Sequence, residues 1–267
     1  MSVPTGTLWR RASRTRRCVI DRLILWNIDL TLLDVGRTSR EAYAEAFGQV
    51  TGRSLAALPQ LAGRSDSEIF FESLFLNDMP SGSDEAADAD LLDAYCARLA
   101  SAFARREAEM RQYGRLLPGA RAAVAAVADL PGVVQTVLTG TIKPNAICKL
   151  RAFGLDGYFD LDIGGYGSDA YPRGSLLLQV QARAAAKYAG PGDQPRTAEP
   201  ATVYVADTVR DVEAARLVGA RCVAVATGRE NLPQLKDAGA DLALPDLADT
   251  ARVIAAIDDL SGVAALR

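Results

Sequence analysis

The sequence predicts an α/β protein with a parallel β-sheet, helices on both faces of the sheet, and a small all-helical domain inserted after the first strand. Short apolar segments alternate with helical segments from residue 118 onward. Such alternation with short connections is typical of a parallel sheet covered by helices. A helical block at 35–117 interrupts this pattern directly after the first apolar segment. The block is therefore interpreted as an insert.

The first strand is predicted at 23–28, because a short, mostly apolar run is typical of a strand buried on both faces. Ser39 is predicted to cap a helix that extends to about Thr51, since apolar residues follow at spacings of three and four. The same reasoning predicts two further helices at 65–75 and 88–110. The loop between them, at 77–87, is rich in Pro, Gly, Ser and Asp.

Beyond Pro118 and Gly119, the predicted elements belong to the sheet and its covering helices. The strands are predicted at 133–138, 161–163 (a weak one), 203–206, 222–225 and 242–244. The helices are predicted at 143–153, 174–187, 209–218, 232–238 and 248–260, with a Gly- and Pro-rich connector at 189–200. The predicted division is a disordered extension at 1–21, a core domain at 22–34 and 118–267, and a cap domain at 35–117.

The composition excludes several classes of function. The chain has no histidine, which excludes Ser-His-Asp and Cys-His catalysis and HExxH zinc sites. Its four scattered cysteines suit a reducing cytosol, so a cytoplasmic location is expected. A net charge of −3 indicates no nucleic-acid partner, and no apolar run approaches the ~20 residues that span a bilayer. The Arg-rich N-terminus is interpreted as an extension rather than a transit peptide. The sequence contains no signal for the oligomeric state.

Polar side chains follow three of the predicted strands. Asn27 and Asp29 end the first strand, Thr139 the second, and Asp207 and Asp211 follow a later one. In open parallel sheets, ligands bind beyond the carboxyl ends of the strands, so these side chains are expected to converge. Clustered carboxylates repel one another unless a cation lies between them, and oxygen ligands without His or Cys suit Mg²⁺. The pattern therefore predicts a magnesium site.

At these residues the chain resembles the haloacid dehalogenase-like (HAD) superfamily, in particular its phosphoglycolate-phosphatase-like members with a helical cap. The resemblance covers about residues 22–260 and implies a Rossmann-like core. The first family motif, DxDx(T/V), stands here as Asn27-Ile-Asp29-Leu-Thr. Thr139 matches the second motif, and Asp207 with Asp211 the fourth. Arg173 best matches the lone basic residue of the third motif, and Lys143 is the alternative.

The resemblance implies a Mg²⁺-dependent phosphatase that acts on a small phosphorylated metabolite. Residue 27 would be the nucleophile, Asp29 the general acid and base, and Thr139 with the basic residue would hold the phosphate. Residue 27, the backbone carbonyl of Asp29 and Asp207 would hold Mg²⁺, with Asp211 as a ligand or close by. In the cap, the segment Arg64-Ser65-Asp66 resembles a substrate-facing loop. Its alternative is a plain turn with Ser65 as a helix cap.

The chain departs from the family motif at Asn27. An amide is a poor nucleophile, whereas an aspartate is ionised at neutral pH. Asn27 therefore favours lost or altered chemistry, in a natural or an engineered protein, unless a neighbouring acid such as Asp34 replaces it. The alternative function is a catalytically impaired, phospho-ligand-binding or regulatory HAD homologue.

Overall fold

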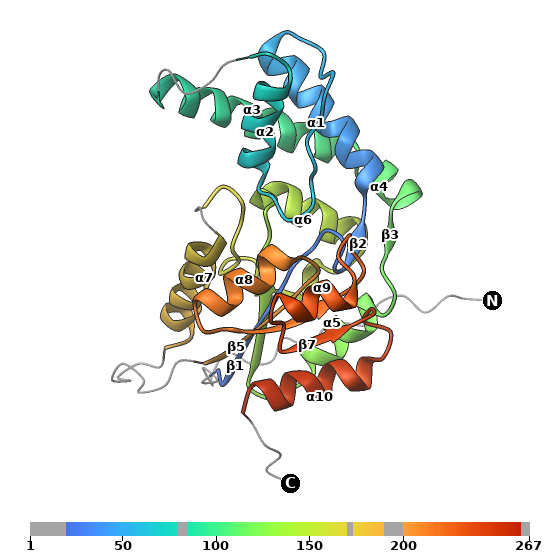
Figure 1. The fold of residues 1–267 in the computed structure, drawn as a ribbon, viewed down its shortest axis with the longest axis vertical. Coiled ribbons are helices and arrows are strands. Elements are labelled where there is room, and N and C mark those ends of the chain that lie inside the picture. The colour runs from blue at the N-terminus through green and yellow to red at the C-terminus, as the bar shows by residue number, and fades with distance from the viewer. Residues whose placement is uncertain (1–19, 80–84, 170–172, 190–199, 263–267) are drawn as a thin grey trace, which may run out of the picture.

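A five-stranded parallel sheet forms the core of the computed structural model, which describes residues 20–79, 85–169, 173–189 and 200–262 (Figure 1). The strand order is β4-β1-β5-β6-β7. The strands are β1 (Arg22–Trp26), β4 (Val133–Val137), β5 (Ala201–Ala206), β6 (Arg221–Val225) and β7 (Leu242–Leu244). Trp26, the last residue of β1, is level with Val137 of β4 and Val205 of β5. The residues that follow these three strands therefore emerge side by side.

Both faces of the sheet are covered, because every residue of β1 is buried and successive side chains point to opposite faces. Ile24 and Trp26 belong to one apolar cluster, while Leu23 and Leu25 belong to another. The first cluster includes α5 (Ala120–Ala128) and α10 (Thr250–Leu260). The second includes α7 (Arg173–Tyr188), α8 (Val209–Leu217) and α9 (Leu232–Asp237). The predicted α/β fold class is confirmed.

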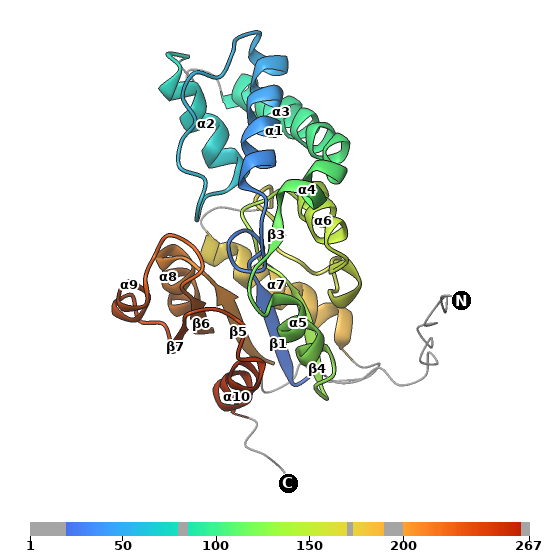
Figure 2. The same ribbon diagram turned by 90° about the vertical axis from the view of Figure 1, so that its right-hand side faces the viewer.

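Four cap helices stand over the edge of the sheet where β1, β4 and β5 end (Figures 1 and 2). They are α1 (Gly36–Thr51), α2 (Asp66–Leu76), α3 (Glu85–Arg105) and α4 (Glu107–Tyr113). The chain enters and leaves them through a short antiparallel pair, β2 (Leu33–Asp34) and β3 (Arg115–Leu116). The Asp34 carboxylate accepts a hydrogen bond from the Arg115 guanidinium at 3.1 Å. Asp34 therefore pairs within the connection between the two parts.

Three sequence-based predictions of elements were wrong. Residues 161–163 form turns and no strand. The backbone around them contacts β4 through the Asp160 N–H, which donates to Gln135, and through an isolated bridge between Leu138 and Gly165. Ser39 does not cap α1, because this helix already begins at Gly36 and buries Ser39. The helix predicted at 88–110 is divided into α3 and α4 at Arg106. The other strands and helices lie within a few residues of their predicted positions.

Some predictions fall on residues that the structure does not describe. Outside the described residues lie positions 1–19 of the extension predicted at 1–21, part of the loop predicted at 77–87 and most of the connector predicted at 189–200. The Arg173 side chain lies outside them as well. Along the described ranges, no helix combines the length and the apolar character needed to cross a membrane.

Gly119 illustrates how closely the segments around α5 pack. It has a φ of +75°, and a Cβ atom at this position would lie 1.9 Å from the backbone oxygen of Leu247. We expect Gly119→Ala to lower the free energy of unfolding by at least ~3 kcal/mol, because the backbone must shift and alanine disfavours this conformation. Gly52→Ala is the matched control, since Gly52 has a φ of +70° with no atom within 4 Å. It should cost only ~1 kcal/mol in urea unfolding. Equal losses would contradict the close contact.

Candidate functional site

The structure brings the side chain of Asn27 into contact with Asp29 and Asp207. Asn27 directly follows β1, and its backbone N–H donates to Val205 of β5. Its Nδ2 donates to Asp207 Oδ1 at 2.9 Å and to the backbone oxygen of Asp29 at 3.3 Å. Its Oδ1 accepts the backbone N–H of Ile28 at 2.9 Å. The side chain is nearly buried, with 6% of its surface exposed. The two acidic motifs thus share one edge of the sheet.

Asp207 follows β5 and is also buried. Its Oδ1 accepts a hydrogen bond from the Thr31 hydroxyl at 2.8 Å in addition to that from Asn27. Its Oδ2 is buried and has no hydrogen-bond partner among the described residues. A Cβ atom at Gly228 would lie 2.2 Å from this Oδ2, so glycine leaves the carboxylate its space. Burial, and secondarily the nearby Asp211 carboxylate, raise the pKa of Asp207 to about 8.

Asp211 lies in the first turn of α8 and is fully buried. Its two carboxylate oxygens accept hydrogen bonds from Thr208 Oγ1 at 2.6 Å and from the Tyr204 hydroxyl at 2.9 Å. Thr208 in turn caps α8 by accepting the Asp211 N–H. Asp211 therefore holds the loop that carries Asp207, and both of its oxygens are already engaged.

Lys149, on α6 (Lys143–Ala152), is a residue that the sequence analysis missed. Its Nζ lies 2.7 Å from Asp29 Oδ2 and 3.1 Å from the Thr141 hydroxyl, which itself donates to Asp29 Oδ2 at 3.0 Å. Nζ also lies 5.1 Å from the centre of the Phe103 ring. The helical spacing offered a signal, because Lys149 falls on the same face of α6 as Ala146, which is buried. A lysine is almost never buried without a charged or polar partner.

Neither Lys143 nor Arg173, the two candidates for the basic residue of the third motif, is seen beside Asp29 among the described side chains. Lys143 begins α6, and its Nζ lies over the Tyr166 ring at 5.5 Å from the ring centre. It is not among the residues that line the cavity described below. The side chain of Arg173 lies outside the described part of the chain. Lys149 is therefore the basic side chain that the structure places beside Asp29.

Asp66, at the start of α2, joins the cap helices to the loop after β4. Its Oδ2 accepts the backbone N–H of Ile142 at 2.8 Å, and its own N–H donates to the Gly140 oxygen at 2.9 Å. The Tyr43 hydroxyl of α1 donates to Oδ1. Burial raises the pKa of the Asp66 carboxyl, an effect that the charge of Lys149 opposes. Asp66 thus fixes the cap helices over the strand ends.

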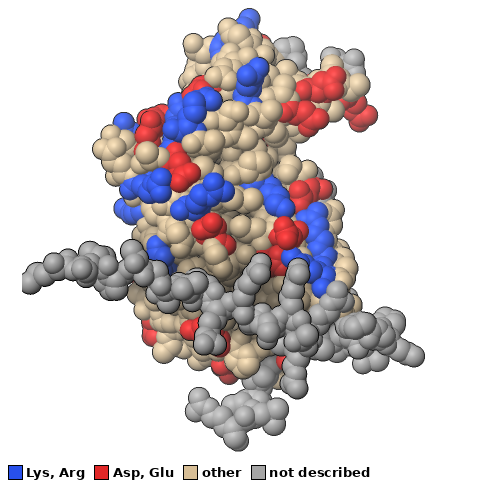
Figure 3. All heavy atoms as spheres, turned by 180° about the vertical axis from the view of Figure 1, so that it is seen from behind, with Lys and Arg blue, Asp and Glu red and all other residues tan. Residues whose placement is uncertain are grey.

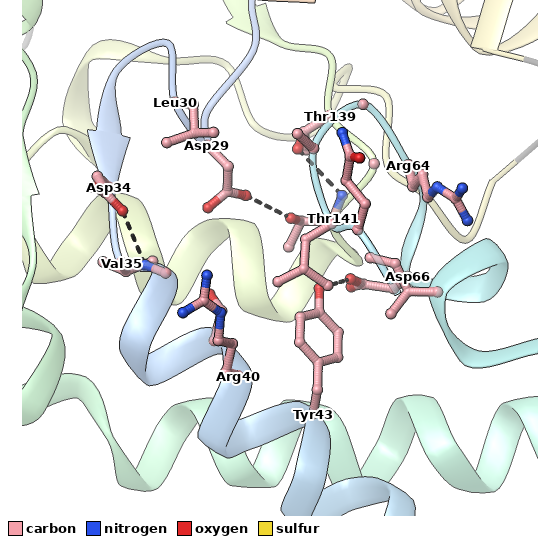
Figure 4. A pocket seen from close by; sticks show the side chains of 18 of the residues that line it. Asp29, Leu30, Asp34, Val35, Arg40, Tyr43, Arg64, Asp66, Thr139 and Thr141 are labelled. Carbon is pink, nitrogen blue, oxygen red and sulfur yellow. Dashed lines mark hydrogen bonds between the residues drawn. The ribbon is translucent and has the colours of Figure 1, made fainter. Parts of the chain in front are cut away.

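The other two residues of the predicted cap loop have structural partners. Ser65 caps α2 in a reciprocal pair with Glu68, as the alternative interpretation of this loop predicted. Arg64 forms an ion pair with Glu72 of α2. Figure 4 shows Arg64 pointing away from Asp29, although it still lines the same cavity.

A cavity of about 580 Å³ lies between the cap helices and the strand ends. Asn27, Asp29 and Thr139 line its floor, and residues 58–64 line the cap side. Its basic lining residues are Arg40, Arg64, Lys149 and Arg229, and its acidic ones are Asp29, Asp34 and Asp66. Figure 4 shows Arg40 extending from α1 toward Asp29. On the rear face of the molecule, basic and acidic side chains lie interspersed around the junction of the two parts (Figure 3).

Comparison with known proteins identifies the family of this fold. The family model of haloacid dehalogenase-like hydrolases matches residues 24–216, well over half of the chain. The chain belongs to the haloacid dehalogenase-like hydrolase family. The match spans the strand ends that carry Asn27, Thr139 and Asp207, as well as the cap helices. No curated protein matches the sequence.

Several solved structures share this HAD fold at low sequence identity. β-Phosphoglucomutase from Clostridium difficile is 13% identical with a TM-score of 0.60, over 91% of this chain and 98% of that one. A predicted phosphoglycolate phosphatase from Haemophilus somnus is 16% identical with a TM-score of 0.56, over 88% and 98%. CbbY from Rhodobacter sphaeroides, as an aspartate-to-asparagine mutant in complex with xylulose-(1,5)bisphosphate, is 21% identical with a TM-score of 0.55, over 86% and 96%.

The family resemblance implies a Mg²⁺ ion at the strand ends, among the atoms of Asn27, Asp29 and Asp207. Magnesium takes six oxygen ligands in near-ideal octahedral geometry. Here the atom of residue 27 that faces Asp207 and the Asp29 carbonyl is an amide nitrogen, which donates hydrogen bonds and cannot ligate a cation. Within the described ranges, no three Asp, Glu, His or Cys side chains form a metal-binding group. The residues present therefore do not fit Mg²⁺.

Proposed function

We propose that this chain binds a small phosphate monoester in the cavity over the strand ends, on the scaffold of a phosphatase-type HAD hydrolase. The observation that carries the proposal is the position of Lys149. This buried ammonium group lies 2.7 Å from Asp29 in a cavity that Thr139 and three arginines also line. Positive charge and hydroxyl donors around one enclosed space are the features that recognise phosphate.

The donors for a phosphate group are available in this arrangement. The Thr139 oxygen accepts the N–H of Thr141 at 3.2 Å, so the Thr139 hydroxyl proton is free to donate to a phosphate oxygen. Two of the three N–H donors of Lys149 are used in hydrogen bonds to Asp29 and Thr141, which leaves the third for a phosphate oxygen. Arg40 has no acceptor in the described part of the chain and extends into the cavity. The cavity volume suits a metabolite and not a polymer.

The two candidate functions, hydrolysis and binding without efficient turnover, differ in the chemistry of residue 27. In the hydrolytic alternative, Asp29 would give a proton to the leaving oxygen of an ester and later activate water. The uncharged amide of Asn27 cannot provide the nucleophile, and this favours binding with little hydrolysis. The bisphosphate bound to the aspartate-to-asparagine mutant of CbbY supports ligand binding of this kind. The predicted cap domain, residues 35–117, would close over the ligand.

Isothermal titration with inorganic phosphate and a panel of small phosphate monoesters tests the proposal. We expect binding by the unaltered chain, and about tenfold weaker binding by Arg40→Gln, since a hydrogen bond to a charged group is lost. Arg37→Gln is the matched control on the same helix, because Arg37 pairs with Glu41 and stacks on Tyr113. Its affinity should be unchanged. Absence of any binding, or equal loss in both variants, would contradict a phosphate site in this cavity.

A further inference from the structure

We propose that the side-chain amide of Asn27 takes the place of the divalent cation, so that the strand ends of this site hold together without a metal. The proposal concerns how the strand ends are joined, whether or not the cavity binds phosphate. It goes beyond the proposed function in that respect, and it is tested separately from it.

The amide nitrogen joins the same groups that a cation would join. Asn27 Nδ2 contacts Asp207 Oδ1 at 2.9 Å and the Asp29 backbone oxygen at 3.3 Å. The sequence analysis assigned these two residues, together with residue 27 itself, to the Mg²⁺ site. A cation would attract both oxygens, and the two N–H groups of the amide do the same through hydrogen bonds. The strand ends therefore need no ion to bring Asp207 beside the Asp29 carbonyl.

The orientation of the amide is fixed by its other contact. Asn27 Oδ1 accepts the backbone N–H of Ile28 at 2.9 Å. Turning the amide by 180° would place Oδ1 against the two acceptors and Nδ2 against the Ile28 N–H, so all three contacts would become repulsive. The side chain is only 6% exposed, so little of it can reach water to compensate for these losses. A cation would have to force this turn before residue 27 could offer it an oxygen.

Asp207 offers little to a cation on its own. Its Oδ1 already accepts hydrogen bonds from Asn27 and from Thr31. Only Oδ2 is without a partner, and it is buried against the backbone of Gly228. Mg²⁺ in proteins is usually held by one or two carboxylates together with waters, and the one carboxylate oxygen of Asp207 that lacks a partner is enclosed.

The positive charge of the site comes from the protein itself. Lys149 Nζ lies 2.7 Å from Asp29 Oδ2, within a side chain that is only 2% exposed. A phosphate bound beside Thr139 would meet this ammonium group and the cavity arginines instead of a bound ion. The site thus combines a neutral hydrogen-bonded bridge at residue 27 with the side-chain amine of Lys149 beside Asp29.

Thermal unfolding with millimolar Mg²⁺ or with EDTA tests the proposal. We expect the same melting temperature for the unaltered chain in both conditions. Asn27→Asp should melt below the unaltered chain in EDTA, because the amide that donates to Asp207 and to the Asp29 carbonyl is replaced by a second acidic group. It should gain about 5 °C or more with Mg²⁺. Asn231→Asp, which changes the cap of α9, adds the same charge outside the site and should show no response to Mg²⁺.

Two further measurements keep the proposal testable if Asn27→Asp does not fold. Titration of the unaltered chain with Mn²⁺ should show no binding at millimolar concentration, and titration with inorganic phosphate should give equal affinity in EDTA and in Mg²⁺. Stabilisation of the unaltered chain by Mg²⁺, or the lack of any response in folded Asn27→Asp, would overturn the proposal. If phosphate does not bind while the Mg²⁺ results are as expected, the proposed function fails and the role of the amide stands.

Discussion

Asn27→Asp is expected to raise the rate of phosphate monoester hydrolysis in Mg²⁺ by on the order of 10³-fold or more. Residue 27 directly follows β1, between the Asp29 carbonyl and Asp207, on the floor of the cavity. An aspartate there would be ionised at neutral pH and could form a bond to phosphorus as the ester oxygen leaves. Asp29 would donate the proton to that oxygen. Release of inorganic phosphate from a panel of esters measures the effect.

The control for this gain removes the acid and base group. Asn27→Asp combined with Asp29→Asn should return the rate close to that of the unaltered chain, because the leaving oxygen then lacks a proton donor. If the unaltered chain already hydrolyses such esters as fast as Asn27→Asp, the amide is no barrier and our account of residue 27 is wrong. If Asn27→Asp stays inert on a broad panel, the scaffold lacks more than a nucleophile.

The fold could be predicted largely from apolar runs and helical periodicity. The apolar run at 23–28 and the alternation of strands and helices after Pro118 were enough to predict a parallel sheet, because a buried parallel strand needs an unbroken apolar segment. The strand predicted at 161–163 is absent because this segment is short and directly followed by Gly164 and Gly165, so that a single isolated bridge forms there. The division at Arg106 depends on how α4 packs on α1 and α6, which lies outside local periodicity.

The candidate site was predictable only in part, since a sequence shows which residues end strands but not what their atoms contact. Asn27, Asp29 and Asp207 were expected at one edge, and the structure places them in contact. The direction of the Asn27 amide depends on the Ile28 N–H, a contact that no motif encodes. Lys149 reaches Asp29 across 120 residues of sequence, so only the tertiary fold reveals the pair.

Asp207→Asn is expected to stabilise the fold at pH 8 and to flatten the dependence of stability on pH. The pKa of Asp207 is raised to about 8 by burial and by Asp211, against about 3.9 in the unfolded chain. Between these values the folded state binds one more proton than the unfolded state. The free energy of unfolding therefore falls as pH rises through this range, by at most about 1.4 kcal/mol per pH unit from this group.

An asparagine at 207 removes the pH-dependent contribution of this carboxyl to the free energy of unfolding. It keeps an oxygen that can accept the hydrogen bonds from Thr31 and Asn27. Urea unfolding in EDTA at several pH values between about 5 and 8 measures the slope. Asp129→Asn, at an exposed position after α5, is the matched control and should keep the slope of the unaltered chain. Parallel curves for all three proteins would show that another group holds the extra proton.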